Sequence, residues 1–203
     1  MSRRTTTLLL TGAALLMGGC ADDSDLEVTG LQPANAIVSR SQLDGALPFH
    51  GEGTGWITSQ VYAPGFPAER STFGGRCSTP SDYIIAFSGS GQIAHLGRAT
   101  VVFEHCSRME MDMSTGAVRF EYEDGEITMM AANGDELRGT YTDGTGELMP
   151  DGNVAWRDTF TLTGGTGRFA GASGTGQDTG TTHSVTGWTL WTMEGTIMYD
   201  AAH

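Results

Sequence analysis

The chain has 203 residues, with 11 arginines, no lysine and 24 acidic residues, and a formal net charge of −13. This charge opposes nucleic acid or anionic lipid as a binding partner, and the lack of lysine excludes Schiff-base chemistry. Thirty glycines with only 17% charged residues favour one turn-rich all-β domain with appendages.

The first twenty residues resemble a bacterial lipoprotein signal peptide. A pair of arginines precedes a short apolar run that ends at Cys20. The run is too short to remain as a membrane span. We therefore expect residues 1–19 to be removed and Cys20 to become the lipidated N-terminus, the alternative being a secreted protein that is cut elsewhere. Ala21 after the cysteine favours the outer membrane, so an exported protein anchored at the outer membrane or cell surface is expected.

Residues 20–47 are acidic and polar and lack strand periodicity, which predicts a flexible tether. Glycines and threonines between Phe49 and Trp56 then indicate a first strand. Prolines and glycines in residues 62–75 are typical of a long irregular connection. The folded domain is therefore expected to cover residues 48–203.

Cys77 and Cys106 flank two apolar segments, residues 83–88 and 99–105. Folded as a hairpin with its turn next to Gly91, these segments bring the two cysteines opposite each other. In an exported protein this arrangement predicts a disulfide. A metal site is the weaker alternative, since no C-x-x-C spacing or nearby histidine accompanies the pair.

Two further features of the sequence could indicate a metal site. His95 lies in the connection of this hairpin, where a surface or turn-bonding role is expected rather than a ligand role. Met109, Met111 and Met113 would lie on one side of an extended chain, and thioethers suit Cu(I). The alternative for the methionines is a hairpin tip or flexible filling of the core.

Alternating apolar and polar residues continue through the middle of the chain. Residues 118–123 and 127–131 alternate as half-buried strands and are separated by Asp124-Gly125. Asn133-Gly134 then predicts a tight hairpin turn into residues 137–141. These elements are expected to be consecutive antiparallel strands.

Asp158 shares one strand face with the apolar side chains of residues 154–162. A carboxyl group inside a barrel would be desolvated and have a raised pKa, which suits proton transfer or binding of a polar ligand group. Two alternatives stay open: Asp158 pairs with an arginine such as Arg138 or Arg168, or it faces water near the rim.

Residues 160–176 indicate a strand, a glycine turn and a second strand. The glycine spacing superficially resembles a phosphate loop, but no helical pattern follows it, so we expect turn roles and no cofactor. The last strand, residues 187–199, has large apolar side chains on both faces. Trp191 and Met193 share one row and Trp188 and Glu194 the other, and the pattern does not decide which row points inward.

Three segments carry a resemblance to a known family: Gly164-Gly-Thr-Gly-Arg-Phe-Ala-Gly-Ala-Ser-Gly174, Ala94-His-Leu-Gly-Arg98 and Ala131-Ala-Asn-Gly-Asp-Glu-Leu-Arg-Gly-Thr-Tyr141. Together they resemble bacterial exported proteins of the allene oxide cyclase-like β-barrel group. The resemblance implies a small closed antiparallel barrel, as in the plant cyclases and the dirigent proteins. Because the matching residues belong to turns and strands, it implies a fold and no particular activity.

A barrel of about eight strands has room for packed side chains or for one small ligand. The favoured interpretation is an envelope lipoprotein that binds a small apolar molecule or a protein partner, with pocket candidates Tyr141, Trp156, Asp158 and Trp191. The first alternative is an isomerase or cyclase in which Asp158 or Glu194 orients the substrate. The second is copper binding through the three methionines.

Overall fold

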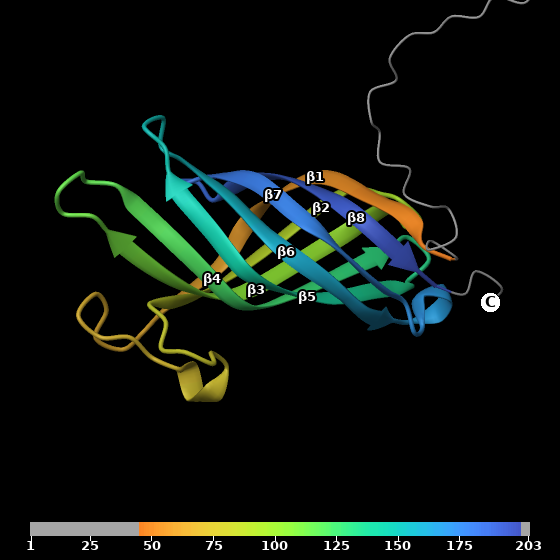
Figure 1. Ribbon diagram of the computed structural model, residues 1–203, viewed down its shortest axis with the longest axis horizontal. Helices are drawn as coiled ribbons and strands as arrows, with labels where there is room; N and C mark the ends of the chain where they lie inside the picture. The colour runs from red at the N-terminus through yellow and green to blue at the C-terminus, as the bar shows by residue number, and fades with distance from the viewer. Residues whose placement is uncertain (1–44, 200–203) are drawn as a thin grey trace, which may run out of the picture. The chain divides into compact units, whose positions relative to one another are not determined.

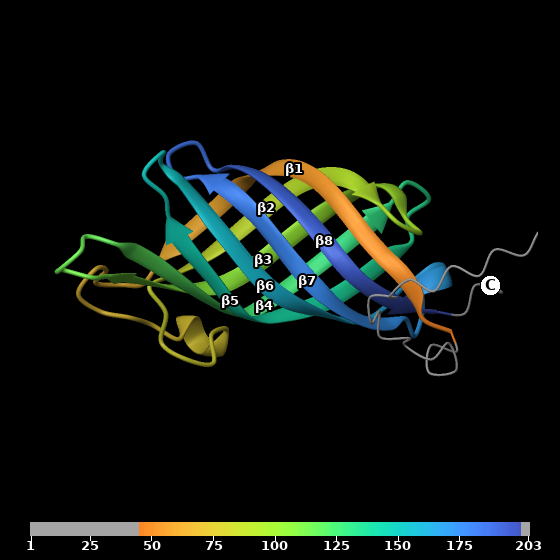
Figure 2. The ribbon, with the colours of Figure 1, turned by 45° about the horizontal axis from the view of Figure 1, so that its top comes forward.

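The computed structural model describes residues 45–199, which form a closed barrel of eight antiparallel strands. Each strand pairs with the next, and the last pairs with the first (Figures 1 and 2). The elements are β1 (Leu47–Tyr62), η2 (Phe73–Gly75), β2 (Tyr83–Ile93), β3 (Gly97–Met111), β4 (Val118–Ala131), β5 (Glu136–Leu148), β6 (Asn153–Gly165), η3 (Gly167–Phe169), β7 (Ser173–His183) and β8 (Trp188–Met198). The all-β barrel expected from the sequence is confirmed. The signal peptide, Cys20 and most of the expected tether lie outside the described residues.

Alternate side chains of each strand point into the barrel, as the pleat of a strand requires. In β6, Asp158, Phe160 and Leu162 are buried while the residues between them are exposed. In β8 the same alternation places Trp191 and Met193 inside, and Trp188 and Leu190 outside. The orientation of the last strand, which the sequence left undecided, is thereby established.

The two ends of the barrel differ. One end holds the β2–β3 and β4–β5 turns and the η3 connection, and its core is closed by the buried side chains of Phe49, Leu96 and Phe169. The other end holds the long connection of residues 63–82 and the β3–β4, β5–β6 and β7–β8 turns. Figures 1 and 2 both show these turns gathered at the end opposite η3.

Glycines on the inner wall make room for aromatic rings. A Cβ atom at Gly125 would lie 2.4 Å from the Tyr141 ring, and one at Gly53 would lie 2.3 Å from the Trp191 ring. Both distances are too short for a Cβ atom to be present at either position. These rings therefore lie directly against the backbone of neighbouring strands, a close approach that only glycine permits.

Cys77 and Cys106 form the disulfide predicted from the sequence, with their Cα atoms 5.8 Å apart. The hairpin geometry behind that prediction is wrong, however. The β2–β3 turn spans residues 94–96, and Ile84 is the residue paired with Cys106. Cys77 belongs to the connection before β2, which returns to β3, so the disulfide joins a loop to a strand.

Arg76 holds the same connection to the barrel beside Cys77. Its Nε atom lies 3.1 Å from a carboxylate oxygen of Glu104 in β3, and its Nη1 donates a hydrogen bond of 2.9 Å to the backbone oxygen of Asp124 in β4. The long connection is therefore attached to the barrel wall by a disulfide and by polar contacts that include these two.

The three methionines do not form the row expected of an extended chain. Met109 and Met111 end β3, but Met113 lies in the turn that follows and is 88% exposed. The backbone is not extended through Met113. The chain reverses direction there, and the Gly116 N–H donates a hydrogen bond to the backbone oxygen of Asp112. Across residues 45–199 the structure contains no helix with the length and apolarity that a membrane crossing requires.

Candidate functional site

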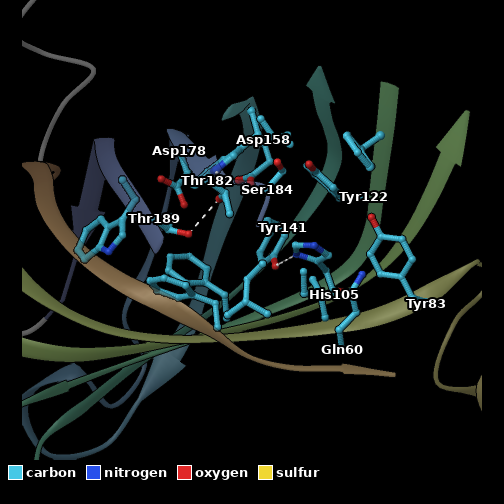
Figure 3. A pocket seen from close by; sticks show the side chains of 18 residues that line it. Gln60, Tyr83, His105, Tyr122, Tyr141, Asp158, Asp178, Thr182, Ser184 and Thr189 are labelled. Atoms are coloured by element: carbon cyan, nitrogen blue, oxygen red, sulfur yellow. Dashed lines mark hydrogen bonds between the residues drawn. The ribbon is translucent and has the colours of Figure 1, made fainter. Parts of the chain in front are cut away.

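A cavity of about 180 Å³ occupies the half of the barrel next to the long connection (Figure 3). Most of its surface is apolar and aromatic. Its lining comprises Ile57, Gln60, Tyr83, Ile85, Phe87, Phe103, His105, Phe120, Tyr122, Tyr141, Val154, Trp156, Asp158, Asp178, Thr182, Ser184, Thr189 and Trp191. Gln60 and Ser184 are exposed residues, so the cavity reaches the surface at this end.

Two carboxyl groups face each other across neighbouring strands in the wall of this cavity. Asp158 in β6 is paired in register with Asp178 in β7, and their exposed fractions are 8% and 1%. Oδ1 of Asp158 and both carboxyl oxygens of Asp178 have no hydrogen-bond partner. Figure 3 shows the two side chains close together at one side of the cavity.

Burial and mutual repulsion hold a proton on this pair. Desolvation raises the pKa of Asp158 to about 7. Desolvation, followed by the charge of Asp158, raises the pKa of Asp178 well above its usual range, and the nearby Thr179 N–H opposes this only in part. Because two adjacent carboxylates resist ionising together, the pair behaves as one unit that shares a proton near neutral pH.

Neither arginine considered from the sequence neutralises Asp158. Arg138 pairs with Glu136, and Arg168 lies 3.7 Å from Asp135. Asp158 also lies inside the wall rather than at an exposed rim. Both structural alternatives for Asp158 are therefore wrong, since the arginines are engaged by carboxylates near the β4–β5 turn.

A second polar group in the cavity wall joins Tyr141 of β5 to His105 of β3. The Tyr141 hydroxyl and His105 Nδ1 are 2.5 Å apart and share a hydrogen bond. The His105 ring also packs against the Tyr122 ring, with 4.6 Å between their centroids. Burial lowers the pKa of His105 to about 3 and raises the pKa of Tyr141 well above its usual range, so both groups are neutral at pH 7.

Trp156 is held in place by a chain of hydroxyl groups. Its Nε1 donates a 3.0 Å hydrogen bond to the Thr182 hydroxyl, which lies 2.9 Å from the Thr189 hydroxyl. Thr189 in turn donates to the backbone oxygen of Gly187 in the β7–β8 turn. The orientation of this ring in the cavity wall is thereby fixed.

All four pocket candidates from the sequence, Tyr141, Trp156, Asp158 and Trp191, line the cavity. Glu194, the other catalytic candidate, is exposed on the outer face of β8 and lies outside that lining. The alternation of β8 explains this position, because Glu194 belongs to the outward row with Trp188.

The structure also shows the contacts of His95 and two cavity residues that were not predicted from the sequence. His95, in the β2–β3 turn, bonds to residues of other segments, with Nε2 2.8 Å from the Pro48 backbone oxygen in β1 and Nδ1 3.1 Å from the Tyr199 hydroxyl after β8. Asp178 and His105 were not singled out from the sequence, although both line the cavity. Extending the β6–β7 hairpin register beyond the glycines would have placed Asp178 opposite Asp158. The alternation after Val101 and Phe103 would have placed His105 inside.

No protein-family model, curated protein or solved structure matches this chain. Within residues 45–199, no three His, Cys, Asp or Glu side chains gather in an arrangement that would hold a metal ion. The molecule is thus defined by its fold and site: a closed eight-strand barrel with a small apolar cavity that contains two buried carboxyl groups.

Proposed function

We propose that this protein is a lipid-anchored bacterial envelope protein whose barrel binds one small, mainly apolar molecule. The observation that carries the binding function is the cavity itself. It is lined by aromatic and aliphatic side chains, carries a few polar groups on its wall and reaches the surface at one end. This combination is typical of small-molecule sites.

The size of the cavity limits the ligand. An apolar protein cavity of about 150 Å³ accommodates benzene. The cavity of about 180 Å³ therefore suits a single ring with a short substituent, or a longer molecule that extends from the mouth past Gln60 and Ser184. The polar groups would orient the ligand, and the apolar wall would supply most of the affinity.

The envelope location and the lineage are parts of the same proposal. Cys20 after an apolar leader supports lipidation, and the acidic residues before β1 suit a tether between lipid and barrel. The Cys77–Cys106 disulfide suits an oxidising compartment. The observed barrel is also the fold expected of the allene oxide cyclase-like group, whose membership we propose on the three segments quoted above.

One observation favours a second candidate, an isomerase that moves a proton within an apolar substrate. A carboxyl group with a pKa of about 7 both donates and accepts protons at neutral pH, and Asp158 has this property inside the cavity. A β,γ-unsaturated cyclic ketone incubated in D₂O would test it by NMR. Deuterium incorporation that is lost in Asp158→Asn would support an isomerase, and no incorporation above the buffer rate would exclude this proton transfer.

The binding function is tested by thermal unfolding against a library of single-ring apolar molecules. We expect several members to raise the midpoint of unfolding and to change the fluorescence of Trp156 and Trp191, which line the cavity. Val154→Phe, which fills the cavity, should reduce both effects. Arg157→Phe adds the same ring to the exposed face of the same strand and should leave both effects unchanged.

Two outcomes would contradict this proposal. The first is that no member of the library stabilises the wild-type protein. The second is that Val154→Phe and Arg157→Phe reduce ligand stabilisation equally, since the binding would then not take place in the cavity.

A further inference from the structure

We propose that the ligand carries a protonated amine, which binds between Asp158 and Asp178 while its apolar body lies in the cavity. This inference rests on the proposed binding function and specifies the chemical class of the ligand. It starts from the register of β6 and β7, which places the two carboxyl groups directly opposite each other on the inner face.

The geometry of the pair suits one small cation. Cβ atoms of directly opposed residues in an antiparallel pair lie about 4.5–5.5 Å apart. Both carboxyl groups therefore reach a common point in the cavity wall. Three of their four oxygens have no hydrogen-bond partner, and Asp178 is almost completely buried. A primary ammonium group has three N–H donors, which matches these acceptors.

None of the cavity-lining side chains brings a positive charge to this pair. His105 from β3, Tyr83 from β2, Tyr122 from β4 and Tyr141 from β5 are the other titratable groups of the lining. Burial lowers the pKa of His105 to about 3 and raises the pKa of Tyr83 to about 12, and it raises the pKa values of Tyr122 and Tyr141 further. All four are neutral at pH 7, so the charge of the carboxyl pair is uncompensated.

The remaining strands of the barrel, β1 and β8, contribute only uncharged groups to the cavity. β1 contributes Ile57 and Gln60, and β8 contributes Thr189 and Trp191. Arg157 follows Trp156 in β6 but is exposed on the outer face. Compensation of the negative charge is therefore left to a bound proton or to a ligand.

A cationic ligand fits this site better than a neutral or an anionic one. An anion would be repelled by the pair, and a neutral alcohol would satisfy one oxygen but leave the charge unpaired. An ammonium group satisfies both the oxygens and the charge. The rings of Trp156 and Trp191 in the same lining add faces that attract cations. With one proton kept on the pair, the complex with a singly charged amine is neutral.

The inference is tested with three molecules of one shape: 2-phenylethylamine, 2-phenylethanol and phenylacetate. Isothermal titration at pH 7.5 should show the amine binding at least about tenfold more tightly than the alcohol, the usual advantage of a charge-assisted hydrogen bond. Phenylacetate should bind most weakly. Both carboxyl groups are then removed together, in the double variant Asp158→Asn, Asp178→Asn, which should bring the amine within about threefold of the alcohol.

Glu194→Gln is the matched control, because it removes one negative charge from the exposed outer face of the barrel. The amine preference should survive this change if the buried pair is the cause. In the wild type, the affinity for the amine should also rise from pH 5 to pH 8 as the pair loses a proton. This second measurement keeps the inference testable if an asparagine variant does not fold.

The outcomes separate this inference from the function on which it rests. Equal affinity for amine and alcohol would overturn the amine assignment and leave small-molecule binding intact. An amine preference that persists in the double asparagine variant, or that falls equally in Glu194→Gln, would also overturn it. If none of the three molecules binds and no library member stabilises the protein, the binding function itself is overturned.

Discussion

At the scale of single residues, the most unusual feature is a pair of buried carboxyl groups that no cation within residues 45–199 neutralises. Asp158 and Asp178 lie side by side in an apolar wall, and three of their four carboxyl oxygens lack a hydrogen-bond partner. A structural carboxylate usually accepts hydrogen bonds or pairs with an arginine, since an unpaired buried charge is destabilising. Retaining two such groups in one cavity is therefore typical of a functional site rather than of a stabilising one.

The carboxyl pair should make Asp158→Asn more stable than the wild type at neutral pH. The pKa of Asp158 is raised from 3.8 to about 7 on folding, so between these values the folded protein binds a proton that the unfolded chain has lost. The wild type therefore loses stability as the pH rises from about 4 to about 7, on the order of 4 kcal/mol for a shift of this size. Asparagine does not titrate and avoids this loss.

Urea unfolding of both proteins at pH 4 and pH 7.5 measures the effect. The difference in unfolding free energy should move in favour of Asp158→Asn as the pH rises, because the variant lacks the titration of Asp158 and also removes its repulsion of Asp178. A variant that is less stable than the wild type at pH 7.5 by several kcal/mol would show that Asp158 is held as a charge.

At the scale of elements, the long connection between β1 and β2 is an attached part of the wall rather than a free loop. The disulfide to β3 and the contacts of Arg76 with Glu104 and Asp124 fix its second half. Asp82, the last residue of the connection, accepts a 2.7 Å hydrogen bond from the Met109 N–H in β3 and also pairs with Arg70 at a distance of 3.2 Å. These contacts hold the connection at the end of the barrel where the cavity reaches the surface.

Removing the disulfide should destabilise the barrel without changing its topology. The two cysteines are separated by 29 residues in the sequence. A bridge that closes a loop of this length typically contributes about 2–4 kcal/mol. We expect the double variant Cys77→Ser, Cys106→Ser to lose this amount in urea unfolding while its β-sheet circular dichroism spectrum is retained. Two free thiols in the native protein would contradict the pairing.

The strands and the cysteine partners could be predicted because alternation and composition are local signals. The position of the β2–β3 turn could not be predicted in this way. Gly89 and Gly91 favour a turn, but they lie in β2, where Gly91 leaves space for the Trp191 ring. That ring comes from the other end of the chain, and local sequence carries no sign of it. Asp178 was missed for a similar reason, since the glycines of β7 concealed its alternation.

At the scale of the whole molecule, the barrel is packed at one end and hollow at the other. β1 enters at the packed end, because Leu47 pairs with Ile197 near the close of β8. Between Cys20 and Leu47 the chain is long enough to extend at most about 90–100 Å. A lipid anchor on Cys20 would therefore keep the start of the barrel within this distance of the membrane.

The anchor is tested by Cys20→Ala in a lipoprotein-processing bacterium. The variant should lose incorporation of labelled fatty acid and move from the membrane fraction to the soluble fraction, because the acidic chain has no attraction for anionic lipid. Unaltered fatty-acid labelling and unchanged membrane fractionation would contradict the proposed lipidation.

The glycine-lined wall has a consequence for how the cavity behaves when it is empty. The rings of Tyr141 and Trp191 rest on backbone atoms at Gly125 and Gly53, and the backbone of a closed sheet has little freedom to shift. An empty cavity therefore keeps its shape instead of collapsing onto itself. Ligand binding then requires little ordering of the protein. The preformed shape of the cavity selects among ligands.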